Sequence, residues 1–144
     1  MFNSILLPID LSAEATWARA APAAVKMARD DGIPLHVATV VPDFGASLVG
    51  SYFEPGFEEN ALHDAGQSLN AWIAENIPDD VDVHAHVLHG SVYDEILKAA
   101  ESLEIDVIVM GSHRPELKDY LIGPNAARVV RHAAQSVFVV RGDA

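Results

Sequence analysis

The stretch VIVMGSHRPELKDYLIGPNAARVV, residues 107–130, contains the pattern that decides the fold. An apolar run ends at Gly111, a polar loop follows, and Gly123 precedes a second amphipathic stretch. The apolar run is typical of a buried strand, and the stretch after Gly123 has the spacing of a helix. A strand, a loop and a helix in this order indicate one α/β unit, and the rest of the chain shows whether the unit repeats.

The same alternation continues along the whole chain. The predicted strands are residues 4–9, 34–41, 81–88, 105–110 and 136–141. The predicted helices are residues 12–30, 58–76, 91–102 and 124–134, and residues 42–57 read as a long loop. Connections of this length require parallel strands and right-handed crossovers. We therefore predict a single domain over residues 1–144, an α/β fold with an open five-stranded parallel sheet and helices on both faces.

Local signals set the expected limits of the first helix. Ser12 is a candidate N-cap, and Gly32 is a candidate stop because glycine readily adopts the left-handed conformation. Pro22 lies inside the stretch, so a kink or an irregular turn is expected there. Trp17 and Trp72 fall on helical stripes and are interpreted as packing residues.

Composition excludes several classes of protein. Half of the 144 residues are hydrophobic, which allows a sizeable core, and there is no cysteine for disulfides or thiolate metal sites. The formal net charge of −12 disfavours nucleic acid as a partner. It reflects either simple solubility or adaptation to high internal salt. No apolar run reaches the ~20 residues that span a bilayer, and the N-terminus lacks a basic signal segment, so a cytoplasmic protein is expected.

The loop after Gly111 suits an anion, although it matches no common nucleotide motif. Neither a Walker P-loop, nor G-x-G-x-x-G, nor G-x-S-x-G is present. Gly111 would let a ligand approach the backbone, and a helix beginning after Gly123 would offer free amides. His113, Arg114 and Lys118 add positive charge between them. A solvated connection with glycine at its two turns explains the same pattern, so this alternative stays open.

Two strand ends carry the residues that could form a site. Pro8, Ile9 and Asp10 follow the first strand, and Met110 and Gly111 end the fourth. In open α/β sheets ligands bind beyond the carboxyl ends of the strands, where the strand order reverses. If these two strands are neighbours, both groups of residues face one crevice.

The segments ILLPID, VMGSHRP and YLIGPNAARVVRHAAQSVFVVR resemble the universal stress protein family over essentially the whole chain. The resemblance implies the sheet order 3-2-1-4-5 and a site for ATP, ADP or AMP, with magnesium as a possible companion. Adenosine contacts would come from the first strand end and from the backbone of Val40. The binding residues so implied are Pro8, Ile9, Asp10, Val40, Met110, Gly111, Ser112, His113, Arg114, Gly123, Pro124 and Asn125.

This sequence departs from the family's phosphate pattern, G-x-x-G, about nine residues, then G-[ST]. Gly111 matches its first glycine and Gly123 its third, but Arg114 stands near the second and Pro124 replaces the hydroxyl residue. Asn125 can donate from its amide, and Arg114 or His113 can supply charge instead. Asp10 has two interpretations, as a cap of the following helix or as a contact to the ribose or to magnesium.

We find no set of nucleophile, base and orienting residue, so we expect nucleotide binding with slow or no hydrolysis. Such a protein would act as a nucleotide-dependent switch or sensor for a regulated protein that the sequence does not identify. The alternatives are a nucleotide-free dimeric interaction protein with a degenerate loop and a nucleotide-cleaving enzyme.

Two further features concern assembly and metals. Residues 136–141 form a strand without proline or internal charge, and the resemblance implies that it pairs with its own copy as a homodimer. The aromatic loop at 42–57 would extend this to a tetramer or fold over the nucleotide. His84 and His86 share a strand face, with His89 beyond, and a polar edge-strand face explains them more simply than zinc.

Overall fold

Strand β1 (Ile5–Pro8) is at the centre of the sheet, and all four of its residues are buried. An unbroken apolar run suits this position, because a central parallel strand is covered on both faces. The structure is a computed structural model, which describes residues 1–42, 57–112 and 124–141.

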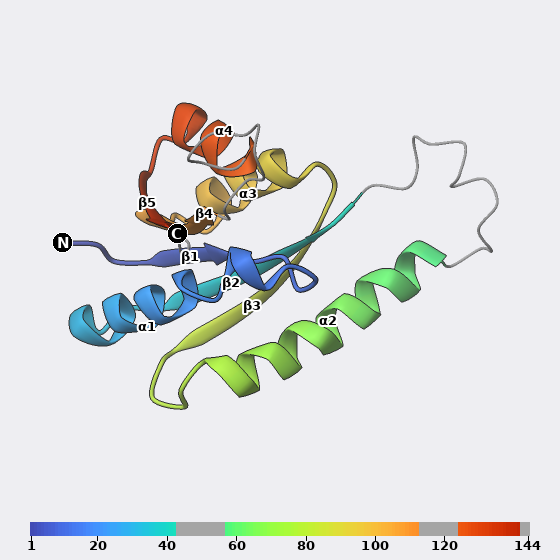
Figure 1. The fold of residues 1–144 in the computed structure, drawn as a ribbon, viewed down its shortest axis with the longest axis horizontal. Helices are drawn as coiled ribbons and strands as arrows, with labels where there is room; N and C mark the ends of the chain where they lie inside the picture. Colours follow the sequence, from blue (N-terminus) through green and yellow to red (C-terminus); the bar gives the residue numbers. More distant parts are fainter. Residues whose placement is uncertain (43–56, 113–123, 142–144) are drawn as a thin grey trace.

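The elements follow one another as strand and helix in alternation (Figure 1). After β1 they are η1 (Glu14–Thr16), α1 (Ala20–Asp31), β2 (Leu35–Val41), α2 (Phe57–Asn76), β3 (Val83–His89), α3 (Val92–Ser102), β4 (Val107–Ser112), α4 (Pro124–His132) and β5 (Ser136–Arg141).

The strands of the described residues form one parallel sheet in the order β3-β2-β1-β4-β5. The predicted five-stranded α/β architecture and the implied order 3-2-1-4-5 are therefore confirmed. The strand at 81–88 was expected at an edge, and β3 is the edge strand beside β2. β5 lies at the other edge.

Alternate residues of the strands build two cores, one on each face of the sheet. Leu7, Val37 and Val109 pack with α1 and α2, whereas Leu6 and Ile108 pack with α3 and α4. Figure 1 shows α1 and α2 below the sheet and α3 and α4 above it. The prediction of helices on both faces is confirmed.

The first helix begins later than the sequence indicates. Residues from 12 onward were expected to be helical with Ser12 as the cap, but α1 starts at Ala20. The Thr16 hydroxyl donates to the Ala13 carbonyl at 2.7 Å, and such local bonds compete with a helix. Pro22 is the third residue of α1, where its missing N–H is tolerated; it would break a helix that began at Ser12.

The other boundaries need smaller corrections. Gly32 ends α1 as predicted, with a φ of 64° in the left-handed region. β4 does not end at residue 110 as predicted, because Gly111 and Ser112 still pair with Val140 and Arg141 of β5. The predicted loop at 42–57 lies almost wholly outside the described residues.

The two tryptophans pack together, as their interpretation as packing residues required. Their rings meet edge to face at a centroid separation of 5.5 Å. Trp17 follows η1 and is not on a helix, so this contact joins the turn after β1 to α2. Among the described helices, none is long and apolar enough to cross a membrane.

Candidate functional site

A cleft of about 480 Å³ opens at the carboxyl ends of β1 and β4. Its volume is within the range of small-molecule sites. From β1 the sheet grows through β2 on one side and β4 on the other, so the cleft lies where the strand order reverses. Its described lining is Pro8, Ile9, Asp10, Ser12, Ala13, Ala15, Thr16, Val40, Pro42, Val92, Ile96, Met110, Gly111, Asn125 and Ala126.

Most of the residues singled out from the sequence lie in this lining. Pro8, Ile9 and Asp10 enter from the end of β1, Val40 from β2, and Met110 and Gly111 from β4. Asn125 enters from the first turn of α4. Residues from four separated parts of the chain thus meet in one cleft.

Other residues of the expected set do not line the cleft or lie outside the described residues. Ser112 is buried in β4 opposite Arg141 and is not part of the lining. Pro124 is the first residue of α4, and its side chain lies outside the described part of the structure. His113, Arg114 and Gly123 lie outside the described residues.

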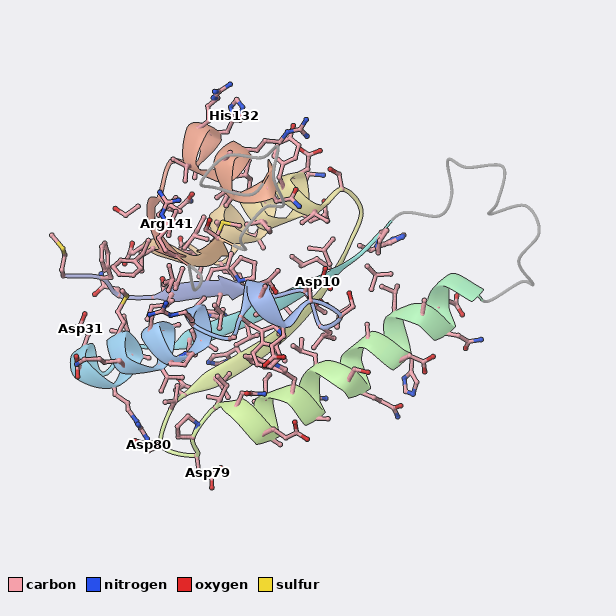
Figure 2. All side chains as sticks on the ribbon, viewed as in Figure 1. Asp10, Asp31, Asp79, Asp80, His132 and Arg141 are labelled. Carbon is pink, nitrogen blue, oxygen red and sulfur yellow. The ribbon has the colours of Figure 1, made fainter. Side chains whose placement is uncertain are left out.

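Asp10 organises the turn that follows β1. Its Oδ1 accepts a hydrogen bond from the Ser12 amide at 2.9 Å and another from the Ser12 hydroxyl at 2.6 Å. Its carbonyl accepts from the Ala13 amide at 3.0 Å. The expectation that Asp10 caps the following helix is wrong, because α1 begins ten residues later. It caps a local turn instead, and its exposed carboxylate lies on the loop after β1 (Figure 2).

Residue 111 has to be a glycine because the backbone of Thr16 packs directly against it. A Cβ at this position would collide with the Thr16 carbonyl oxygen and would lie 2.9 Å from the Thr16 carbonyl carbon. The turn that contains η1 therefore rests directly on the end of β4. The sequence correctly indicated a close approach at Gly111, but the approaching group is backbone of the same chain.

The described lining of the cleft carries a single charged side chain. Asp10 is the one titratable residue of the described lining. α4 has no acidic residue in its first turn, so no carboxylate of the helix competes for the positive end of its dipole, which lies beside Asn125 of the lining. The arrangement offers one carboxylate, two hydroxyls from Ser12 and Thr16, and an exposed amide side chain at Asn125.

Sequence reasoning missed the residues that close the cleft from the sides. Ser12 and Thr16 were hidden because their stretch was interpreted as helix. Val92 and Ile96 lie four residues apart on α3, a spacing that places both on one helix face. Their apolar stripe was visible in the sequence, but only the topology shows that this face borders the cleft.

The histidines do not form a metal centre in the described residues. No group of three or more histidine, cysteine, aspartate or glutamate side chains there is placed to hold a metal ion. His84 and His86 instead stack around a third imidazole, His36 of β2, which the sequence did not link to them.

Comparison with known proteins agrees with the fold. A family model described as the universal stress protein family matches residues 1–141. Universal stress protein G of Shigella flexneri is 36% identical over 144 residues, which cover 98% of this chain and 100% of that protein.

Solved structures of the family share the architecture. A universal stress protein from Archaeoglobus fulgidus matches with a TM-score of 0.74 at 21% identity, over 96% of this chain and 98% of that one. An Archaeoglobus fulgidus universal stress protein in complex with dAMP matches with 0.69 at 20% identity, over 95% and 96%. A universal stress protein in complex with cAMP matches with 0.63 at 18% identity, over 99% and 98%. The match of the family model across residues 1–141 and the relative at 36% identity show that the chain belongs to the universal stress protein family.

Proposed function

We propose that the cleft binds an adenine nucleotide and that the protein acts as a nucleotide-dependent switch or sensor for a protein partner. The observation that carries the proposal is the meeting of Asp10, Val40, Gly111 and Asn125 around one cleft at the switch point of the sheet. Relatives of the same fold with dAMP and cAMP bound support the choice of an adenine nucleotide.

The lining suits the parts of such a ligand. Val40, Ile96 and Met110 give an apolar wall on which a flat base can pack. Asp10 and Ser12 lie on the polar side, where a ribose can hydrogen-bond. The amino end of α4 favours an anion, so we assign the phosphates to the side of Asn125.

The ligand in the proposal is ATP, ADP or AMP. Where a magnesium ion accompanies the phosphates, the Asp10 carboxylate would be its ligand. Carboxylate oxygen is a preferred ligand of magnesium. Arg114 and His113 are proposed to contact the outer phosphates. We propose binding with slow or no hydrolysis: the Asp10 carboxylate that accepts from the Ser12 hydroxyl holds the turn after β1, and the described lining contains no histidine or lysine that could act as a base.

The first experiment asks whether nucleotide binds and whether Asp10 takes part. Calorimetry with ATP and AMP, with and without magnesium, is run on the wild type, on Asp10→Asn and on Asp79→Asn. Asp10→Asn keeps an acceptor for Ser12 but removes the charge, so we expect affinity to fall by about 1–3 kcal/mol. Asp79 is exposed and lies far from the cleft (Figure 2), and its variant should bind as the wild type does.

Equal affinities in all three proteins would remove Asp10 from the site. Chromatography of any nucleotide released from purified protein gives an independent answer about the ligand. Failure of every adenine nucleotide to bind would refute the proposal itself.

One observation favours a second candidate, a nucleotide-free interaction protein. The Thr16 backbone already occupies the space that the missing Cβ of Gly111 leaves, so the glycine does not require a ligand. Pro124 adds neither a hydroxyl nor an amide donor. Calorimetry separates the two candidates, because only the first predicts saturable binding.

We also propose that the protein pairs with its own copy through β5. β5 is an edge strand, and its Phe138 is 48% exposed. An exposed apolar edge with free amides favours pairing with another strand.

A further inference from the structure

Three imidazoles gather on β2 and β3: His36 and His84 are the second residues of their strands, and His86 is at the middle of β3. His36 of β2 lies level with His84 of β3, and the next residue pair on the same face brings His86 beside Ala38. The ring of His36 stacks on both partners, with centroid separations of 4.9 Å to His84 and 5.1 Å to His86. Parallel register therefore turns three separated histidines into one cluster, which we call the histidine stack.

The bond inside the histidine stack depends on protonation. His36 Nδ1 and His86 Nε2 are 2.8 Å apart, which is a hydrogen-bond distance. Such a bond needs one nitrogen that carries hydrogen and one that offers a lone pair. When both rings are protonated, two N–H groups face each other and two positive charges lie in contact.

The surroundings of His36 and His86 oppose their protonation. Burial lowers the pKa of His36, the neighbouring His86 and His84 lower it further, and the carboxylate of Asp82 raises it. Burial first and His84 second lower the pKa of His86. The Asp82 carboxylate accepts from His84 at 3.1 Å on the exposed side.

The other elements around the histidine stack add no compensating charge in the described residues. On β1 the neighbour of His36 is the apolar Leu6. The core of this face comes from α3 and α4, and α2 covers the other face. On α3, Glu95 pairs with Lys98 at 3.3 Å, while Asp94 and Glu101 are exposed.

We propose that His36, His84 and His86 form a proton-sensitive latch that holds the edge strand β3 on β2. The neutral stack joins the two strands side by side, and protonation replaces its hydrogen bond by repulsion. Within the described sheet β3 pairs only with β2, so losses at this junction are not shared with another strand.

The latch is linked to the cleft through the chain. β3 leads through Gly90 into α3, whose Val92 and Ile96 form part of the cleft wall. Gly90 has a φ of 138°, a conformation that residues with a side chain rarely adopt. Acid that loosens β3 therefore loosens the connection into α3 at Gly90, while Ile96 and Ala100 keep the helix in the core with Leu6 and Ile108.

The direction of the effect follows from the lowered pKa values. The unfolded chain takes up protons on these histidines near pH 6.5, before the folded protein does. The contribution of the latch is therefore complete above pH 6.5 and is lost as pH falls through the lower folded pKa values. A reduction of one pKa unit corresponds to about a tenfold change in the opening equilibrium.

Hydrogen exchange of the wild-type protein tests the latch without any substitution. Amide protection, corrected for the intrinsic pH dependence, is compared between about pH 8 and about pH 5.5. We expect protection of β3 (Val83–His89) to fall roughly tenfold while that of β4 (Val107–Ser112) stays nearly constant. Equal changes in both strands, or none in β3, overturn the proposal.

Matched histidine variants provide a second test of the latch. His36→Gln removes the centre of the stack, and His63→Gln removes an exposed histidine of α2. The stability difference between the two pH values should shrink in His36→Gln and remain in His63→Gln. If His36→Gln folds poorly, His86→Gln serves the same purpose. Unaltered pH dependence in the stack variant overturns the latch.

Discussion

Gly111 lies where the turn after β1 rests on the end of β4. Because a Cβ there would collide with the Thr16 carbonyl, Gly111→Ala must push the turn away from the strand. We expect the free energy of unfolding to fall by about 1–3 kcal/mol, which is typical of overpacking. Denaturant unfolding monitored by circular dichroism measures this loss.

Gly66 supplies the matched control for that substitution. It lies within α2, where an added Cβ would meet only Val87 Cγ2 at 3.8 Å. Alanine favours a helix over glycine by about 1 kcal/mol, so Gly66→Ala should stabilise the protein. A Gly111→Ala protein as stable as the wild type would show that the turn does not press on β4.

The residues around the cleft show what a sequence can predict at this scale. Asp10 and Gly111 were indicated correctly as members of one crevice, because strand ends and glycines leave local signals. The partners that fix them were not predictable, since the bond from Ser12 to Asp10 and the contact from Thr16 to Gly111 depend on how the turn folds. Why Asn125 follows a proline in this chain has no explanation in the structure.

Among the elements, α1 depends on a single residue for its end. Gly32 adopts a φ of 64°, and an added Cβ would meet nothing within 4 Å. Gly32→Ala therefore suffers only the conformational penalty of the left-handed region, and we expect a loss of about 1 kcal/mol. Gly32→Asn should lose less, because asparagine tolerates this conformation better. Equal stability of all three proteins in denaturant titrations would contradict this account of the helix end.

Strands were easier to predict than the start of α1. The buried strands appear as apolar runs, and those runs coincide with β1, β2 and β4 to within about two residues. The stretch after Asp10 has the spacing of a helix, yet Thr16 bonds back to the local backbone and Pro22 limits how early a helix can begin. Hydrophobic periodicity shows which face of a helix would be apolar. It carries no information about a side-chain hydrogen bond or a proline that prevents the helix from starting there.

At the scale of the whole molecule, alternation of strand and helix was sufficient to predict parallel strands. The order of the strands was not contained in that pattern, and it came from the family resemblance. Two sheets with the same alternation can differ in order, because a right-handed crossover allows the next strand to lie on either side once the chain reverses.

Net charge gives a prediction about salt. With 21 acidic residues against nine lysines and arginines, repulsion within the folded chain is the larger electrostatic effect. The pair in which Arg29 donates to both oxygens of Asp80 is exposed, and the bond from Arg29 lowers the pKa of Asp80. Salt screens such an exposed pair, but the loss is small because the pair contributes little to stability. We expect molar KCl to raise stability by about 1 kcal/mol, or roughly 3–5 °C in Tm.

The control for this experiment is the same titration near the isoelectric point, where the repulsion and hence the effect of KCl should largely disappear. A melting temperature that is identical at zero and molar KCl near neutral pH would contradict salt adaptation.

Self-pairing of β5 can be tested through the direction of its amides. The Ser136 amide donates to the Asp106 carbonyl at 3.2 Å, so it points toward β4. Amides alternate in direction along a strand, so that of Val139 points to the open edge.

Val139→Pro therefore removes one amide from the proposed intermolecular ladder and none from the bonds to β4. We expect the dimer to dissociate at least about tenfold more readily, which corresponds to the loss of about one to two hydrogen bonds. Val139→Thr keeps the amide and the branched side chain, and it should remain as dimeric as the wild type. Light scattering across micromolar concentrations measures all three proteins. A wild type that scatters as a monomer refutes the pairing. A Val139→Pro protein that stays fully dimeric would instead place the interface on another surface, such as the one around Val130 of α4, which is 45% exposed.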